Sequence, residues 1–411
     1  MNWKHVSLGE ISVNIQTGPF GSQLHQSDYS EKGTPVVMPK DLISGHISEE
    51  SIARVSDDHV ERLSRHKIEV GDILYSRRGD VGRCAFASET EAGWLCGTGC
   101  LRVTIDSRKA NPKFVFYQLL KADTIGWVEK HAVGSTMLNL NTSILSSVPI
   151  DLPSHDKQNH IVGVLSAYDD LIENNQKQIK LLEEAAQRLY KEWFVDLRFP
   201  GHETTPIVDG VPDGWTYKPF SEVFDYVRGK SYTSKELSDT TGILMANQKN
   251  IRAFGGYNRN AEKRFTGQYK ANQMLYAGDI VMGVTDMTQE RRLVGHVALV
   301  PDLGEKMTFS MDLIKIIPKL TDNLFLYSAM YYGGLSKQIS PLANGVNVLH
   351  LKPEAMMGIE MLIPTKDILE RYHQQFAPMV TRIEALQKQC DVAAEARDRL
   401  IPKLMNREIE V

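Results

Sequence analysis

Two stretches of the sequence, Val148-Pro149-Ile150-Asp151-Leu152-Pro153 and Ile359-Glu360-Met361-Leu362-Ile363-Pro364, decide the fold. Their final prolines are 211 residues apart, and the same offset carries Leu165 to Phe376 and Leu189 to Leu400. Upstream of each stretch the offsets between similar segments vary from 207 to 213, as between Gly71-Asp72 and Gly278-Asp279 or Val81-Gly82 and Val294-Gly295. The chain is therefore an internal repeat, in which each half is a variable globular segment followed by a helix.

Both helical segments carry a heptad seam, because their apolar residues recur in steps of four and three. Asn175 is a polar exception of the kind that fixes helix register. The predicted helix-pairing residues are Leu165, Ile172, Asn175, Ile179, Leu182, Leu189, Phe376, Ile383, Leu386 and Leu400. The alternative is that each helix packs only on its own domain, but a seam over about five heptads in both copies favours mutual pairing.

The pattern predicts two α+β globular domains, at 1–155 and 214–365, rather than doubly wound parallel sheets. Thr34–Met38 and Asp72–Ser76 are predicted to be buried strands, and a helix is predicted after Asn111-Pro112 with a counterpart at 323–331. The long helices are assigned to 156–198 and 366–411, the second ending near Pro402. Pro200-Gly201 and the turn-rich residues that follow indicate a linker at 199–213.

The composition is that of an ordinary globular protein, with 411 residues, 42% hydrophobic and 24% charged. A formal net charge of -4 argues weakly against a nucleic-acid binder that acts alone, and fits a protein with surfaces covered by partners. The four cysteines indicate a reducing compartment; Cys96 and Cys100 lack the second pair that a zinc site needs, so buried thiols are predicted. No leader and no run of about 18 apolar residues is present, and a cytoplasmic location is expected.

Sequence motifs for catalysis are missing. The chain has no phosphate-binding G-x-x-x-x-G-K-[ST] loop, no G-x-G-x-x-G, no H-E-x-x-H and no amino-methyltransferase tetrapeptide of Asn or Asp, two prolines and an aromatic. Pro301-Asp302 with Glu305-Lys306 resembles a nuclease fragment, but the acid and the lysine have the wrong spacing. We therefore predict no catalytic residue, no metal ligand and no cofactor bound by this chain.

A glycine-punctuated turn places Arg77, Arg78 and Arg83 between two predicted strands. Arginine offers bidentate contacts to guanine or phosphate, and glycine lets backbone approach closely. In the second half the matching turn is predicted at Gly283-Val284-Thr285-Asp286, with Arg291 and Arg292 after it. Two domains that read different sequences should differ in this way. The alternative interpretation of the arginine turn is an ordinary hairpin tip exposed to solvent.

Other loop residues at matching places in the two halves are candidates for DNA contact, although each alone is equally consistent with ordinary loop chemistry. These candidates are Gln23, Lys40, Ser135, Thr136, Arg228, Lys230, Asn247, Gln248 and Lys249.

The ordered set of segments resembles one family, the specificity subunits of type I restriction–modification systems. The segments that carry the resemblance are Trp3 with Leu8-Gly9-Glu10, Thr17–Ser22, Gly71–Leu74 leading into Arg77-Arg78-Gly79, Gly134-Ser135-Thr136 with Leu140-Asn141, Val148–Pro153, Asp170-Leu171-Ile172, Asn174-Asn175 and Arg188–Phe194. The second half repeats the set more loosely and lacks the arginine pair at Gly283-Val284, so its DNA contacts are assigned less directly.

The resemblance implies two target-recognition domains, each reading one half of a split DNA site, separated by two long antiparallel coiled-coil helices that set the spacing. Antiparallel pairing would turn the direct repeat into a pseudo-two-fold, which suits inverted half-sites. The implied partners are double-stranded DNA, two modification subunits that bind S-adenosylmethionine and methylate adenine, and two ATP- and Mg-dependent restriction subunits that can join them.

Two other functions remain open at this point. A solitary methyltransferase or fused restriction enzyme is disfavoured by the missing catalytic and cofactor motifs. A scaffold that joins proteins through its helices without touching DNA is mildly favoured by the net charge of -4.

Overall fold

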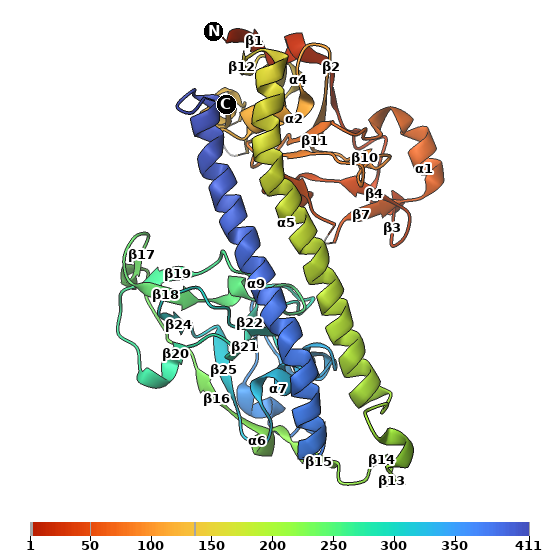
Figure 1. The fold of residues 1–411 in the computed structure, drawn as a ribbon, viewed down its shortest axis with the longest axis vertical. Helices are drawn as coiled ribbons and strands as arrows, with labels where there is room; N and C mark the ends of the chain where they lie inside the picture. Colours follow the sequence, from red (N-terminus) through yellow and green to blue (C-terminus); the bar gives the residue numbers. More distant parts are fainter. Residues whose placement is uncertain (1–2, 50, 135–136, 411) are drawn as a thin grey trace. The chain divides into compact units, whose positions relative to one another are not determined.

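A computed structural model describes residues 3–49, 51–134 and 137–410. The chain forms two compact units, one made of Met1–Glu173 with Cys390–Val411 and the other of Asn174–Gln389 (Figure 1). Each unit therefore combines one globular domain with a part of each of the two long helices, α5 (His155–Tyr190) and α9 (Lys366–Met405).

The first unit contains two four-stranded sheets. One is antiparallel in the order β2 (Ser12–Thr17), β11 (Cys100–Ile105), β8 (Ile73–Ser76), β9 (Cys84–Phe86). The other has the order β10 (Leu95–Cys96), β4 (Thr34–Val37), β7 (Ala53–Val55), β3 (Tyr29–Ser30), with β10 and β4 parallel. A separate pair joins β1 (Lys4–Ser7) to β12 (Pro149–Leu152), so the two ends of the domain meet just before α5.

The second unit repeats this topology. Its antiparallel sheet has the order β16 (Phe224–Arg228), β25 (Leu313–Pro318), β21 (Ile280–Gly283), β23 (Val297–Leu299). Its other sheet has the order β17 (Leu237–Ser238), β19 (Lys263–Phe265), β18 (Ile243–Ala246), β24 (Met307–Phe309), β20 (Met274–Leu275), with β18 and β24 parallel. The pair β15 (Thr216–Pro219) and β27 (Glu360–Ile363) matches β1 and β12. The predicted α+β class and the repeat are confirmed.

Equivalent short helices cover the antiparallel sheets. In the first unit α2 (Pro112–Leu119) begins at Asn111, whose side chain accepts hydrogen bonds from two backbone N–H groups at the helix start. In the second unit α7 (Asn323–Tyr331) begins at Asp322, 211 residues further on, whose carboxylate accepts from Phe325 N. Side-chain oxygens at these positions satisfy N–H groups that lack a partner inside the helix, and the cap at Asn111 was predicted from the sequence.

The two long helices run antiparallel in each unit taken by itself. In the first unit Arg397 donates to Asp169 (2.8 Å) and Cys390 donates to the carbonyl of Ile172 (3.8 Å). In the second unit Asn175 donates to Gln389 (3.2 Å) and Arg382 donates to Gln178 (3.3 Å), so the predicted polar seam residue Asn175 does face the other helix. Because residue numbers rise along one helix as they fall along the other, the pairing is antiparallel.

All ten predicted helix-pairing residues are buried or half-buried. The buried ones are Leu165, Ile172, Asn175, Phe376 and Leu386, and the half-buried ones are Ile179, Leu182, Leu189, Ile383 and Leu400. The seam also packs against the domains: Leu165 joins the first domain's core with Tyr75 and Phe114, and Phe376 joins the second domain's core with Phe325. The helices therefore pack both on each other and on the domains. Mutual pairing and packing on a domain, the two alternatives for the seam, occur together.

Three boundaries differ from the sequence prediction. The first long helix ends at Tyr190 and continues as one wide π-helical turn, Lys191–Val195, before Phe199 enters the second unit's core. The linker contains a small hairpin of β13 (Ile207–Val208) and β14 (Val211–Pro212). The second long helix passes through Pro402 to Met405, because a proline near a helix end removes only one hydrogen bond of the helix.

Candidate nucleic-acid interface

The arginine turn of the first unit connects β8 to β9, as predicted. Arg78 is exposed and its side chain makes no hydrogen bond or ion pair with the residues that the structure describes. Arg83 is exposed and pairs with Asp80 of the same turn. Arg77 is half-buried, and its guanidinium carbon lies 5.7 Å from the ring centroid of Phe20, a cation–π contact. The turn thus presents the guanidinium of Arg78 to the solvent, unpaired among the described residues.

Two further loops pack against this turn. Thr98 donates a hydrogen bond to the carbonyl of Pro19 (2.9 Å), and Arg77 N donates to the carbonyl of Gly99 (2.8 Å). Gly18 lies so close to the 97–99 loop that a β-carbon there would overlap the carbonyl of Gly97. The loops 18–23, 77–83 and 97–99 therefore lie together at one edge of the antiparallel sheet.

Lys40 and Gln23 lie on segments at the same edge. Lys40 is exposed, and its ammonium donates to the carbonyl of Ser51 (2.9 Å). Its neighbour Pro39 lies beside Gly99. Gln23 uses its side-chain oxygen to accept from Phe20 N (3.1 Å), so it shapes the loop that holds Phe20.

A fourth loop, 133–140, closes the group. Leu140 N donates to the carbonyl of Arg77 (2.8 Å), and Gly79 N donates to the carbonyl of Leu138 (3.1 Å). Ser135 and Thr136, the two candidates in this loop, lie outside the described residues. All the predicted contact residues of the first half that the structure describes are thus brought to one group of loops.

The second unit builds an equivalent group from the matching segments. Gly229 approaches the carbonyl of Ser310 as Gly18 approaches that of Gly97. Leu351 N donates to the carbonyl of Val284 (2.8 Å), as Leu140 N does to that of Arg77. The group therefore consists of 229–231, 284–295, 310–312 and 344–351.

The predicted turn at Gly283-Val284-Thr285-Asp286 is wrong. Gly283 ends β21, and Thr285–Asp286 form a buried short strand, β22, that pairs with β26 (Leu349–His350). The turn itself lies further on: Asp286 accepts from the backbone N–H groups of Thr288 (2.8 Å) and Leu293 (2.6 Å) and so closes the intervening loop. The sequence could not predict this strand, because it has only two residues and its partner lies more than 60 positions away. Two residues are too few to show an alternating pattern.

Arginines of this loop hold its conformation in part. Arg291 adopts a left-handed backbone conformation with φ +53°, and Arg292 forms an ion pair with Glu290. Both are half-buried.

Arg228, another predicted contact residue, lies at the end of β16 and donates a hydrogen bond to Glu354 (2.7 Å). A hydrogen bond from the Tyr226 hydroxyl, together with the one from Arg228, lowers the pKa of Glu354 to about 2.

The amide-rich segment 247–250 is mostly turned inward. Asn247 is buried and donates to the carbonyl of Ala261 (2.6 Å) and to Asn250 (3.0 Å). Gln248 donates to the carbonyl of Thr285 (2.9 Å) and so ties this segment to the loop group. Lys249 is exposed and Lys230 is half-buried. A direct base contact by Asn247 would require its two internal hydrogen bonds to break, so Lys249 is the better placed candidate on this segment.

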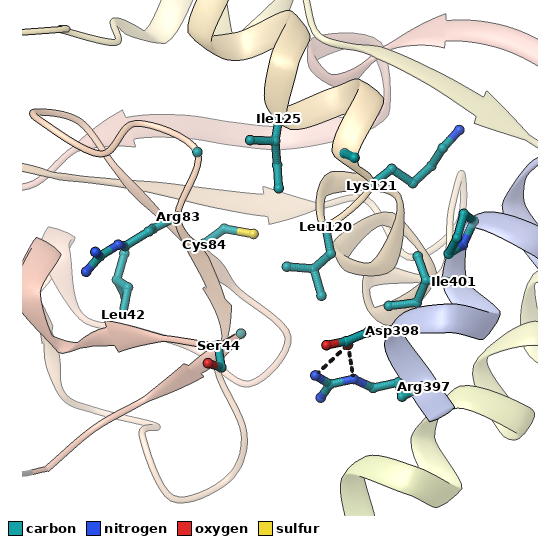
Figure 2. Close-up of a pocket in the computed structure, with 14 residues that line it drawn as sticks. Leu42, Ser44, Arg83, Cys84, Leu120, Lys121, Ile125, Arg397, Asp398 and Ile401 are labelled. Atoms are coloured by element: carbon teal, nitrogen blue, oxygen red, sulfur yellow. Dashed lines mark hydrogen bonds and ion pairs between the residues drawn. The ribbon is translucent and has the colours of Figure 1, made fainter. Parts of the chain in front are cut away.

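A cavity of about 430 Å³ opens beside the arginine turn of the first unit (Figure 2). Leu120 and Ile125 line it with Ile401 of α9, and Arg397 and Asp398 are hydrogen bonded to each other at its edge. Its lining is mainly apolar, and the charges of Arg83, Arg397 and Asp398 are already paired, so we interpret it as a packing gap between α9 and the domain.

Cys84, Cys96 and Cys100 are buried thiols, as predicted, whereas Cys390 is half-buried, and burial raises the pKa of Cys84 and Cys96 to about 12. Within residues 3–49, 51–134 and 137–410, no group of three or more His, Cys, Asp or Glu side chains is arranged to hold a metal ion. None of the helices described is long and apolar enough to cross a bilayer.

Comparison with known proteins agrees with this geometry. Residues 1–184 match the family model of the type I restriction modification DNA specificity domain. The chain is 27% identical to the type I restriction enzyme MjaIX specificity subunit of Methanocaldococcus jannaschii, over 92% of this chain and 87% of that one. It is 21% identical to the HindI specificity subunit of Haemophilus influenzae, over 99% and 100%.

The fold also matches a solved structure. The S subunit of a type I restriction–modification system from M. genitalium aligns with a TM-score of 0.56 and 14% identity, over 98% of this chain and 96% of that one. The duplicated domains with their loop groups define a DNA-specificity protein. Residues 1–184 match the type I restriction modification DNA specificity domain, and the chain is similar over nearly its whole length to type I specificity subunits, so the resemblance drawn from its sequence is confirmed.

Proposed function

We propose that each globular domain reads one half of a split DNA target through its loop group. As a type I specificity subunit, the chain serves DNA sequence recognition and is not itself catalytic, since the catalytic activities of such systems lie in other subunits. The observation that supports the division into two half-sites is the duplication: the same loops meet at the same sheet edge in both units, with different side chains.

The proposed partners follow from the family. Specificity subunits bind DNA and assemble with other subunits. For this chain we propose two modification subunits, which supply S-adenosylmethionine and methylate adenine, and two restriction subunits, which use ATP and Mg in a restricting complex. We further propose that this complex acts in the cytoplasm and that the helices dock the modification subunits.

The helices are proposed to set the spacing between half-sites. At 1.5 Å per residue, the 36 residues of α5 span about 54 Å. One turn of DNA is about 34 Å, so a helix pair of this length suits a ruler for half-sites in successive turns.

Co-expression with modification subunits, followed by sequencing for N6-methyladenine, tests the proposal. We expect a split motif, methylated on both strands, that appears only when this chain is present. A complex that assembles but methylates no specific sequence would indicate a scaffold instead. Arg78→Ala in the same strain should change or weaken the methylated motif if the loop group reads it. Val70→Ala, an exposed change at the other end of β8, is the control and should leave the motif unchanged.

A further inference from the structure

The two units share a short turn that carries one lysine. In the first unit the chain leaves β4 and enters the 3-10 turn Pro39–Asp41, with Lys40 in its middle. In the second unit the chain leaves β18 and enters the 3-10 turn Gln248–Asn250, with Lys249 in the same place. Both strands belong to the parallel pair of their sheet, β4 with β10 and β18 with β24. The two lysines are therefore structurally equivalent.

A buried side chain holds each of these lysine turns. Asp41 accepts a hydrogen bond from Met38 N (2.8 Å), and Asn250 accepts one from Asn247 N (2.8 Å). Asp41 is 2% exposed and Asn250 is 0% exposed, whereas the lysine beside each of them is exposed. Such a bond to a nearby backbone N–H group fixes the conformation of a short turn. Each lysine thus projects into solvent from a backbone that is held in the same way in both domains.

Each lysine turn is joined to the loop group of its own domain. The carbonyl of Val37, the last residue of β4, accepts from Gly97 N (2.9 Å). The carbonyl of Ala246, the last residue of β18, accepts from Ser310 N (2.8 Å). Gly97 and Ser310 are the residues whose carbonyls the tight glycines of the neighbouring loops approach. The lysine turn is therefore attached at the same place in both loop groups.

The charges of the two lysines are not neutralised inside their domains. The ammonium of Lys40 donates to the carbonyl of Ser51 (2.9 Å), a neutral acceptor, and an ammonium has two further N–H donors. Among the residues that the structure describes, the side chain of Lys249 has no hydrogen-bond partner, and no carboxylate forms an ion pair with either lysine. Arg54 and Arg264, another equivalent pair, differ, because each donates to a backbone carbonyl and pairs with a glutamate of its own domain.

We propose that Lys40 and Lys249 bind backbone phosphates of the two half-sites and so position each domain on the DNA without reading its sequence. The inference rests on the proposed function, because it takes the loop groups to be the DNA-facing edges. Arginines stand at different places in the two loop groups, as expected of residues that meet different bases. The lysines are the same in both, and the part that two half-sites of different sequence have in common is the sugar–phosphate backbone. An ammonium, a compact point charge, suits a phosphate oxygen.

The first test measures how binding depends on salt. It uses the complex with modification subunits, a duplex with the target found by methylation sequencing, and a duplex of equal length without that target. Lys40→Gln and Lys249→Gln should each make the plot of log affinity against log salt concentration about 0.9 less steep, since one phosphate contact is lost. Affinity should fall by up to about eightfold at about 0.1 M salt, equally for both duplexes. The methylated motif should not change, and Lys40→Arg, which keeps the charge, should keep the wild-type slope.

The second test matches each lysine to one phosphate. Ethylation interference identifies the phosphates whose charge the wild-type complex needs, and a methylphosphonate then neutralises them one at a time. Lys40→Gln should be insensitive to the loss of one of these charges in one half-site, and Lys249→Gln to the loss of one in the other half-site. If every methylphosphonate weakens the variants as much as it weakens wild type, the lysines do not meet a phosphate and the inference is wrong.

Two lysines of the same sheets serve as controls. Lys32 and Lys306 are exposed, and they come before β4 and β24, at the opposite end of the strands from the lysine turns. Lys32→Gln and Lys306→Gln remove the same charge and should keep the wild-type slope. A slope that falls equally in these controls would reduce the effect to net charge and overturn the inference.

Three further results would overturn the inference. An unchanged slope in Lys40→Gln and Lys249→Gln removes both side chains from the DNA. A changed methylated motif assigns them to bases, and loss of assembly with modification subunits assigns them to a protein contact. Failure of the proposed function is a separate result: the wild-type complex then prefers no sequence, while the salt slopes and the methylphosphonates still decide whether the lysines bind phosphates.

Discussion

At the scale of single residues, the contrast among the three arginines of the 77–83 turn decides what each can do. Arg77 is engaged with Phe20 and Arg83 with Asp80, whereas Arg78 is exposed and unpaired among the described residues. We expect Arg78→Ala to weaken DNA binding most. A guanine contact would cost about 1–3 kcal/mol of discrimination at one position, and a phosphate contact would weaken all sequences alike and reduce the salt slope by about one. Binding measured over a range of salt concentrations separates the two, and an unchanged affinity and slope would remove Arg78 from the interface.

Asp286 offers a residue-scale prediction about pH. Although burial raises its pKa, hydrogen bonds from Leu293 N, Thr288 N and the Thr288 hydroxyl lower it overall. A carboxylate with a lowered folded-state pKa contributes stability above its unfolded pKa of about 3.9, and loses that contribution as pH falls through the folded value. Asp286→Asn should therefore lower the free energy of unfolding by about 1.5–3 kcal/mol at pH 7.

Urea unfolding at pH 7 and at pH 3 checks this. The difference between Asp286→Asn and wild type should shrink at the lower pH, because the carboxyl of the unfolded wild-type chain takes up a proton there that the folded chain binds less tightly. Asp209→Asn, an exposed change in the linker, should match wild type at both pH values. An equal difference in unfolding free energy at the two pH values would show that the charge of Asp286 does not stabilise the loop.

At the scale of elements, α5 and α9 contact each other through different residue types in the two units. In the first unit Asp169 of α5 accepts from Tyr117 of α2 (2.5 Å) and from Arg397 of α9 (2.8 Å), and Asp169 and Arg397 are both buried. The positions 211 residues away from these two are Val380 and Ala186. The contact between the two long helices in the first unit therefore includes a buried ion pair. The equivalent positions in the second unit, Val380 and Ala186, are apolar.

Replacing one partner of this pair should be far worse than replacing both. Asp169→Leu removes the buried counterion of Arg397 and leaves it only the exposed carboxylate of Asp398, and we expect a loss of unfolding free energy of up to about 3–5 kcal/mol. The double change Asp169→Leu with Arg397→Met removes both charges, and we expect it to recover most of that loss. Denaturant unfolding of Asp169→Leu, Arg397→Met and the double variant gives the coupling free energy directly; single and double variants of equal stability would contradict it.

The elements differ in how far the sequence predicts them. The long helices, the capping residues Asn111 and Asp322 and the inward Asn175 follow from periodicity and local hydrogen-bonding chemistry, which act over a few residues. The strand Thr285–Asp286 exists only because Leu349–His350 lies beside it. Likewise, burial of Asn247 depends on the carbonyl of Ala261, so its residue type indicates a DNA contact that its environment disfavours.

At the scale of the whole molecule, the repeat separates what is constant from what differs. The offset of 211 residues holds through the helices and also at Gly134 and Gly345, where the backbone leaves no freedom. The segment between β21 and β23 is six residues longer than its counterpart between β8 and β9, and its arginines stand at different places. The sequence thus locates the loops for which we propose DNA contact in each domain, but the bases that they would read depend on loop conformations that no periodicity encodes.

The spacing proposal makes a prediction for the intact complex. Inserting one heptad into α5 after Gln176, with a second heptad in α9 before Lys388, keeps the seam in register, because seven residues restore the same face. If the helices act as the ruler, the preferred gap between half-sites should grow by about 10 Å, or about three base pairs, while both half-sites keep their sequences. Methylation sequencing of the variant reads the gap and the half-sites together. Insertion of the same heptad into the linker at Asp209-Gly210, outside both long helices, is the control and should leave the gap unchanged. A lengthened helix pair with an unchanged gap would show that the modification subunits, and not this chain, set the distance.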